Sequence, residues 1–299
     1  MFDNKVIAIT GAGSGIGRAL ALGLAGRGAV LALSDKDEVG LAETRRLLGN
    51  RPASITVLDV TDTAALNGWI SAAVSDFGKL DGIINNAGLS VVAPFADCPR
   101  EDFDRVMAVN FTGVVEGCRA ALPHVRSAAA KDGVGWIVNI SSVFGMMGYP
   151  TQSAYNASKY AVRGLTEAMA LELALTDPNI AVIRVHPGGI KTNVAKNSKR
   201  IALLPGQDPN ADFAAEFEKN APTTPEQAAQ TIINGMERRS TRVLIGPDAR
   251  FIDWMVRLFP VSHFTVIGGF LSRRKSGMGR GHEQFPQTRA LWSPRHQPR

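Results

Sequence analysis

Three residues between positions 142 and 159 have the types and the spacing of a site that exchanges a proton with an oxygen atom. Tyr155 and Lys159 are four residues apart, so on a helix their side chains lie on one face. Ser142 closes an apolar run, residues 136–140, that has the pattern of a buried parallel strand. Open α/β sheets bind ligands at the carboxyl ends of their strands, where a strand end and the next helix can bring these side chains together.

The chemistry that this set supports is acid–base catalysis at an alcohol or carbonyl group. A free tyrosine has a pKa near ~10, too high for a general base at neutral pH. A nearby ammonium favours the phenolate, so we expect Lys159 to lower the pKa of Tyr155. Tyr155 then exchanges a proton with the substrate oxygen, Ser142 hydrogen-bonds that oxygen, and a hydride moves at the adjacent carbon. A core ring and a solvated charge at this spacing are the alternative, so the pair needs support from elsewhere in the chain.

A glycine-rich turn follows the first predicted strand, residues 5–10. Gly11, Gly15 and Gly17 have the spacing G-x-x-x-G-x-G, and a helical pattern begins there. Strand, turn and helix in this order predict a dinucleotide site, because glycines let backbone N–H groups approach a pyrophosphate at a helix N-terminus. A tight turn that binds nothing is the alternative.

Asp35 ends the second predicted strand, residues 29–34, and lies 18 residues after Gly17. A carboxylate there accepts hydrogen bonds from the adenosine ribose and repels a 2′-phosphate, which favours NAD over NADP. Lys36 beside it could bind that phosphate instead, so NADP is not excluded. Asp35 could also cap the helix predicted over residues 38–48.

The rest of the chain alternates strands and helices. Strands are predicted at residues 5–10, 29–34, 54–58, 80–84, 134–140, 180–186 and 242–245. Later helices are predicted over residues 38–48, 62–77, 100–113, 114–131, 153–175 and 225–239, with a short one near 211–219. This alternation predicts the α/β class: one doubly wound, parallel, seven-stranded sheet of the Rossmann type, with helices on both faces. The segment 191–220 is long enough to be a lid.

The formal net charge of +6 belongs to the end of the chain. Residues 272–299 carry seven Lys or Arg and one acid, so residues 1–271 hold 26 basic and 26 acidic side chains. A body without a basic excess does not favour nucleic-acid binding. Cys98 and Cys118 give neither a disulfide framework nor a metal-ligand spacing. With two cysteines and no signal-peptide pattern at the N-terminus, we expect a reduced, cytoplasmic setting. No metal is needed where a tyrosine hydroxyl and a serine polarise the substrate oxygen.

Together these motifs resemble the classical short-chain dehydrogenase/reductase family over about Lys5 to Pro247. The motifs stand in the family's order: residues 10–17, Asn-Asn-Ala-Gly at 85–88, Ser142, Tyr155-x-x-x-Lys159, and Pro-Gly at 187–188 followed by Ile190 and Thr192. The resemblance implies hydride transfer between a nicotinamide and a carbonyl or carbinol carbon. It also implies a homodimer or homotetramer.

The resemblance implies a role for each matched catalytic residue. Tyr155 is the acid/base, Lys159 lowers its pKa and holds the nicotinamide ribose, and Ser142 polarises the substrate oxygen. Asn110 positions a water that relays protons to Lys159. An intact set of these four residues argues against one alternative, a nucleotide-sensing protein without catalysis.

The resemblance further implies a set of cofactor contacts. Asp59 and Val60 flank the adenine, and Ile190 and Thr192 hold the carboxamide. The implied cofactor-binding residues are Gly11, Ser14, Gly15, Ile16, Gly17, Asp35, Asp59, Val60, Asn86, Ala87, Gly88, Tyr155, Lys159, Pro187, Ile190 and Thr192.

Four apolar side chains between Ser142 and Tyr155 suggest the substrate. These are Phe144, Met146, Met147 and Tyr149. As a lining they suit a lipid-like, steroid-like or aromatic molecule, although they could equally be core residues. We therefore predict an NAD-preferring oxidoreductase of hydrophobic secondary alcohols or ketones. An NADPH-dependent carbonyl reductase is the alternative.

The chain continues beyond the resemblance. We divide it into a catalytic domain (residues 1–249), an amphipathic extension (250–271) and a basic tail expected to be flexible (272–299). Packing of the extension on the body or on another subunit is the interpretation that we favour. The alternative is peripheral contact with an anionic membrane, reinforced by the basic residues 273–275.

Overall fold

The computed structural model describes residues 1–192, 198–203, 215, 219 and 221–263. The tail from residue 272, the last part of the extension and most of the helix predicted near 211–219 lie outside the described residues. Within the described part of the chain, no helix has the length and apolarity needed to cross a membrane.

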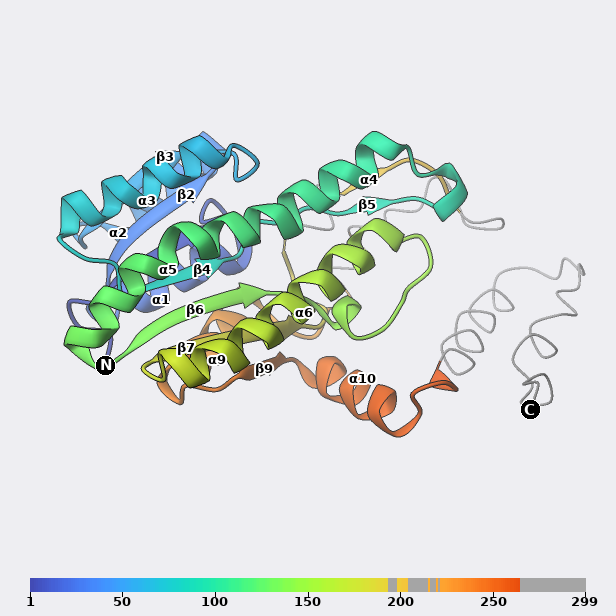
Figure 1. Ribbon diagram of the computed structural model, residues 1–299. Coiled ribbons are helices and arrows are strands. Elements are labelled where there is room, and N and C mark those ends of the chain that lie inside the picture. The colour runs from blue at the N-terminus through green and yellow to red at the C-terminus, as the bar shows by residue number, and fades with distance from the viewer. Residues whose placement is uncertain (193–197, 204–214, 216–218, 220, 264–299) are drawn as a thin grey trace, which may run out of the picture.

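Seven parallel strands form one twisted sheet in the order β3-β2-β1-β4-β6-β7-β9 (Figure 1). The strands are β1 (Val6–Thr10), β2 (Val30–Asp35), β3 (Ala53–Val57), β4 (Gly82–Asn85), β6 (Gly135–Ile140), β7 (Ile180–Pro187) and β9 (Arg242–Ile245). This confirms the predicted sheet. A second, two-stranded pair, β5 (Val91–Val92) and β8 (Lys199–Arg200), was not predicted, because two residues are too few to show a strand pattern.

Helices cover both faces of the sheet, because alternate side chains of each strand point to opposite sides (Figure 1). On one face α1, α2 and α9 pack over Ile7 and Ile9, and on the other α3, α5 and α6 pack over Val6 and Ala8. The helices are α1 (Gly15–Ala25), α2 (Glu38–Leu48), α3 (Thr63–Phe77), α4 (Arg100–Met107), α5 (Gly113–Asp132), α6 (Ser153–Thr176), α9 (Pro225–Glu237) and α10 (Pro247–Leu258).

The strand order places the ligand crevice. From β1 the chain runs outward to β2 and β3 on one side, and then crosses to β4 and the remaining strands on the other. A doubly wound sheet opens at such a reversal, above the carboxyl ends of its strands. The glycine-rich turn after β1 and the Asn-Asn-Ala-Gly segment after β4 therefore face each other across this crevice.

Two helix boundaries differ from the prediction. The helices predicted over 100–113 and 114–131 are joined through a π-helical turn, η2 (Ala108–Thr112), which contains the buried Asn110. Its side chain bonds to backbone outside the helix, and π turns of this kind often occur at functional sites. The last helix begins at Pro247, before the predicted boundary at residue 250, because proline fits the first position of a helix.

Candidate active site

Tyr155 and Lys159 lie in the first two turns of α6, and Ser142 lies just beyond the end of β6. Lys159 is 3% exposed, its Nζ donates to the carbonyl oxygen of Ile140 at 2.9 Å, and it lies 5.6 Å from the centre of the Tyr155 ring. Burial lowers the pKa of Lys159 to about 8, because a low-dielectric surrounding disfavours the ammonium. The predicted trio is therefore assembled, with the almost fully buried lysine beside the Tyr155 ring.

The pKa of Tyr155 differs from the expectation. Burial raises it, and a hydrogen bond with the Ser142 hydroxyl opposes this rise without cancelling it. The expected lowering by Lys159 is not seen, because burial is the largest cause of the shift and Ser142, not Lys159, is the group that opposes it. At neutral pH the phenol is consequently protonated, which is the form that donates a proton to a carbonyl oxygen.

The Ser142 backbone is held by a residue that the sequence analysis did not single out. The ring Nδ1 of buried His186, at the end of β7, lies 2.9 Å from the Ser142 carbonyl oxygen. Burial lowers the pKa of His186 to about 4, so the ring is neutral near pH 7 and can donate Nδ1–H to that oxygen. The Ser142 hydroxyl also accepts from the backbone N–H of Phe144 at 3.1 Å.

The segment between Ser142 and α6 is fastened by Asn156, which the sequence analysis also missed. Its Nδ2 donates to the carbonyl oxygens of Phe144 at 2.8 Å and Met147 at 2.7 Å, and its Oδ1 accepts from the N–H of Tyr149 at 3.1 Å. The rings of Phe144 and Tyr149 stack with centres 5.1 Å apart, and Phe144 meets Tyr155 edge-on at 6.2 Å. Asn156 thus fixes the aromatic groups next to the predicted acid/base.

Asn110 is fully buried within η2. Its Oδ1 accepts from Leu89 N–H at 2.9 Å, while Nδ2 donates to the Leu89 carbonyl at 2.9 Å and to Ser158 Oγ at 3.1 Å. A Cβ built on Gly88 would lie 3.3 Å from Asn110 Oδ1 and 3.6 Å from Lys159 Nζ. The absence of a side chain at Gly88 therefore leaves a gap between the asparagine and the lysine, while the predicted water relay stays a prediction.

The glycine-rich turn is shaped for a close approach. Gly11 and Gly15 have positive φ angles of 67° and 51°, and a Cβ on Gly17 would overlap the carbonyl oxygen of Gly11. The Asp35 carboxylate accepts from Gly13 N–H at 2.8 Å and from Asp37 N–H at 2.9 Å. Asp35 thus ties the turn to the end of β2, in addition to its predicted contact with a ribose.

A second tie joins the two sides of the crevice. Asn86 Nδ2 donates to the carbonyl oxygens of Thr10 at 3.1 Å and Gly11 at 3.0 Å. The Thr10 hydroxyl accepts from the N–H groups of Asn86 at 3.0 Å and Ala87 at 3.1 Å. Thr10 was not predicted to have a role, because a hydroxyl in an apolar strand gives no sign of a partner on another strand.

The loop after β7 reaches the glycine-rich turn. A Cβ on Gly15 would lie 3.2 Å from the Thr192 methyl carbon, and Ile190 pairs with Thr223 in an isolated bridge. Gly189 N–H donates to Oδ2 of Asp248 at 2.6 Å, so the first turn of α10 holds this loop. Pro187, Ile190 and Thr192, like Asp59 and Val60 after β3, stand at the carboxyl edge of the sheet, where the other predicted cofactor residues lie.

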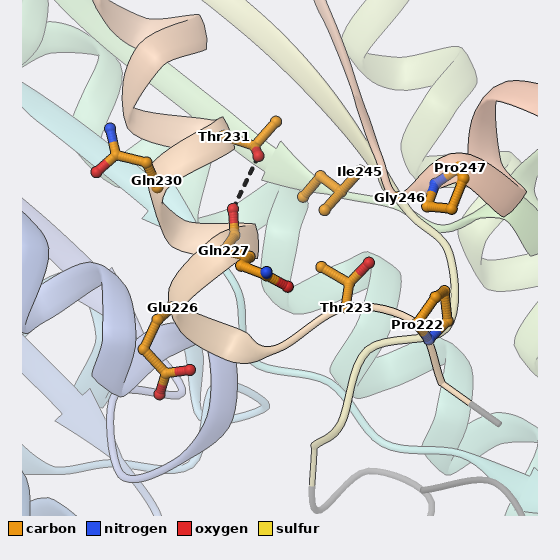
Figure 2. A pocket seen from close by; sticks show the side chains of 9 residues that line it. All are labelled: Pro222, Thr223, Glu226, Gln227, Gln230, Thr231, Ile245, Gly246 and Pro247. Atoms are coloured by element: carbon orange, nitrogen blue, oxygen red, sulfur yellow. Dashed lines mark hydrogen bonds between the residues drawn. The ribbon is translucent and has the colours of Figure 1, made fainter. Parts of the chain in front are cut away.

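A separate hollow of about 650 Å³ lies beside the N-terminus of α9. Figure 2 shows its lining, which includes Thr223, Gln227 and Thr231. Thr231 donates to the Gln227 carbonyl at 2.8 Å, and Gln227 forms a capping box with Thr224. Gln227 and Thr231 already bond within the helix, and Thr223 pairs with Ile190. None of the three belongs to the predicted trio, so we place the active site at the sheet edge instead.

The comparisons with known proteins agree with this geometry. Residues 5–201 match the family model described as short chain dehydrogenase. The chain is 42% identical over 275 residues to the Mycobacterium tuberculosis oxidoreductase SadH, covering 91% of this chain and 97% of that protein. It is 36% identical over 214 residues to 3-ketodihydrosphingosine reductase of Bacteroides thetaiotaomicron, covering 71% and 73% respectively.

A solved structure shows the same similarity in three dimensions. A short chain dehydrogenase/reductase from Burkholderia phymatum, in complex with NAD, matches with a TM-score of 0.75 and 28% identity. The match covers 89% of this chain and 95% of that one. With the family model matched over most of the sheet and the Tyr155/Lys159 pair in place, the chain belongs to the short-chain dehydrogenase/reductase family of oxidoreductases.

Proposed function

We propose that this protein transfers a hydride between NAD(H) and a hydrophobic secondary alcohol or ketone, with Tyr155 as the acid/base. One observation carries the proposal: the buried Lys159 ammonium lies 5.6 Å from the ring of Tyr155, whose hydroxyl interacts with that of Ser142, at the carboxyl edge of the sheet. A nucleotide-binding protein without catalysis has no need of a desolvated phenol beside a serine and a desolvated lysine.

The residues at the crevice fit a dinucleotide. Gly11 and Gly15 have positive φ angles and Gly17 packs against the Gly11 carbonyl, so the turn is bare backbone whose N–H groups can approach a pyrophosphate, and the α1 N-terminus favours its charge. Asp35 offers a carboxylate to the adenosine ribose, and Thr192 stands beside Gly15 at the nicotinamide end. When bound, the nicotinamide supplies or accepts the hydride. The NAD-bound relative supports NAD as the cofactor, and Asp35 supports a preference over NADP.

The protein's own residues manage the proton. Ser142 and Tyr155 both present hydroxyls to one point, so a substrate oxygen bound there takes a hydrogen bond from each. Burial keeps the proton on Tyr155 until a carbonyl oxygen accepts it during reduction, and the reverse transfer serves alcohol oxidation. Lys159, with a pKa of about 8, can exchange protons near neutral pH, and the gap at Gly88 lies between it and Asn110.

The substrate end is partly aromatic. Met146 and Met147 are buried, whereas Phe144 and Tyr149 are half-buried; the Phe144 ring meets Tyr155 edge-on and stacks on Tyr149. Of the four predicted lining residues, we therefore retain only Phe144 and Tyr149 as contacts for the substrate. Their aromatic rings suit an alkyl or aryl ketone. The relative named 3-ketodihydrosphingosine reductase, a reductase of a ketone, supports this class.

The test is turnover of a panel of alcohols and ketones of rising size with NAD(H) and NADP(H), comparing wild type with Tyr155→Phe. The variant keeps the ring and loses the exchangeable proton, so we expect turnover to fall by ~10²-fold or more while cofactor binding remains. Near-full activity of Tyr155→Phe would show that another group is the acid/base. Cofactor binding without turnover of any compound by the wild type would favour the sensing protein.

A further inference from the structure

The helix α10 lies at the edge of the molecule and packs on the body through one of its faces (Figure 1). Ala249 and Met255 on that face are buried. Ala249 and the partly buried Ile252 belong to one apolar cluster with the segment after β6, which carries Phe144. This packing holds α10 beside the substrate end of the proposed site.

The opposite face of α10 is apolar and open to solvent. Phe251, Trp254 and Leu258 are 59%, 54% and 56% exposed, and their spacing of three and four residues places them on one side of the helix. Beyond the helix, Phe259 and Val261 are 44% and 67% exposed. The Trp254 ring lies 6.2 Å, centre to centre, from the rings of both Phe251 and Phe259. We call these five residues the exposed strip, and large apolar groups gathered in this way are typical of an interaction surface.

The charges beside the exposed strip are mainly positive. Arg250 and Arg257 are exposed, and both positions are helix neighbours of Trp254, at four and three residues. The acid nearest to them, Asp253, is 19% exposed and pairs with Arg242 of β9 as well as with Arg257. One carboxylate shared between two arginines leaves an excess of positive charge next to the strip.

We propose that the exposed strip docks α10 onto the surface of an anionic membrane, at the level of the lipid headgroups. Tryptophan, phenylalanine and leucine on one face, with arginines beside them, are typical of helices that lie in a bilayer interface. A negative leaflet attracts these arginines, and residues 272–299, with a net charge of +6, add to that attraction. A second copy of the chain would bring the arginines of two such faces together, which is unfavourable.

Docking through this face has a consequence for the substrate. A hydrophobic ketone dissolved in the membrane would lie on the side of the protein where α10 packs with the Phe144 segment. This consequence rests on the proposed function, whereas the docking itself does not and is tested without turnover.

The experiment uses the full-length chain and vesicles of phosphatidylglycerol or phosphatidylcholine. Trp254 is the fluorescent probe in a Trp292→Phe background, because the remaining tryptophans, Trp69 and Trp136, are only 3% and 0% exposed. We expect the Trp254 emission to shift to shorter wavelength with phosphatidylglycerol vesicles and to stay unchanged with phosphatidylcholine. Added salt should reverse the shift, because it screens the attraction between the arginines and the lipid.

Variants identify the surface that binds. Phe251→Ser combined with Leu258→Ser changes side chains that are exposed in the free protein, so the melting temperature should stay nearly unchanged. Their loss should weaken vesicle binding by about 10-fold or more, because each side chain contributes apolar area that the bilayer buries. Val39→Ser combined with Leu47→Ser makes a matched change to exposed positions of α2 and should leave binding within about twofold.

Three results would overturn the inference. An unchanged Trp254 emission with phosphatidylglycerol vesicles would show that the strip does not enter the membrane. Binding that survives the double substitution in α10 but is lost when residues 272–299 are deleted would assign the contact to the basic tail alone. An emission shift that follows protein concentration in the absence of lipid would show that a second copy covers the strip.

Discussion

The ammonium of Lys159 is buried where a hydrophobic side chain would be more stable. We therefore expect that replacing Lys159 raises the stability of the protein and abolishes its activity. Below pH 8 the lysine is charged in both the folded and the unfolded chain, so the folded state bears the full cost of burying the charge. As the pH rises from about 8 towards 10.5, the folded lysine loses its proton first, and the protein becomes more stable. Lys159→Met removes this pH-dependent cost.

The size of the effect follows from the pKa. A depression from 10.5 to about 8 corresponds to roughly 3 kcal/mol, at about 1.4 kcal/mol for each pH unit. Loss of the hydrogen bond to Ile140 offsets about 1 kcal/mol or more of that gain. We expect Lys159→Met to be about 1–2 kcal/mol more stable than the wild type near pH 7, and inactive.

The pH dependence is the sharper test, because the lost hydrogen bond lowers the stability of Lys159→Met equally at pH 7 and pH 9. Urea unfolding of both proteins at pH 7 and pH 9 should show the advantage of Lys159→Met shrinking by about 1.4 kcal/mol. Tyr155 titrates above this window and His186 below it, and both are present in each protein. Parallel stability profiles from pH 7 to pH 9 would refute the argument that the buried lysine titrates near pH 8.

Three further predictions concern the cofactor, the loop and the extension. NAD(H) should bind at least ~10-fold more tightly than NADP(H), and equal affinities in the wild type would contradict this. Asp35→Ala should narrow the difference in affinity and should also weaken NAD(H) binding, because the carboxylate also holds Gly13. Asn156→Ala removes three hydrogen bonds and should lower the free energy of unfolding in urea by about 2–4 kcal/mol, with a loss of activity as the segment between Ser142 and α6 becomes less ordered. An unchanged urea midpoint would show that Asn156 does not hold this segment in place. Deleting residues 272–299 should leave activity and melting temperature nearly unchanged, whereas salt-sensitive co-sedimentation of the full-length protein with anionic vesicles would support a membrane contact.

The sequence was sufficient for the sheet and the trio because their signals are local. Buried parallel strands are continuous apolar runs in the sequence, and the four-residue spacing of Tyr155 and Lys159 predicts that they share a helix face. His186 and Asp248 gave no such signal, because their partners are backbone groups 44 and 59 residues away. Asn156 was hidden for a similar reason, since it bonds backbone atoms whose positions only the folded loop defines.

The pKa of Tyr155 shows a different limit of sequence reasoning. Spacing revealed that an ammonium would be near the phenol, and proximity alone predicts a lower pKa. The direction depends on burial as well, and burial is a property of everything packed around α6 rather than of two positions in it. Burial was decisive for both groups, raising the pKa of Tyr155 and lowering that of Lys159.

The extension is more closely joined to the active site than its position at the end of the chain suggests. Asp248, in the first turn of α10, accepts from Gly189 in the loop that the family resemblance assigns to the nicotinamide, and Asp253 pairs with Arg242 of β9. On the opposite side of α10, Phe251 and Trp254 are 59% and 54% exposed. Among the described residues, the helix therefore packs on the body through one face and exposes an aromatic face. Any partner that covers this face would act on a helix whose first turn holds the cofactor loop.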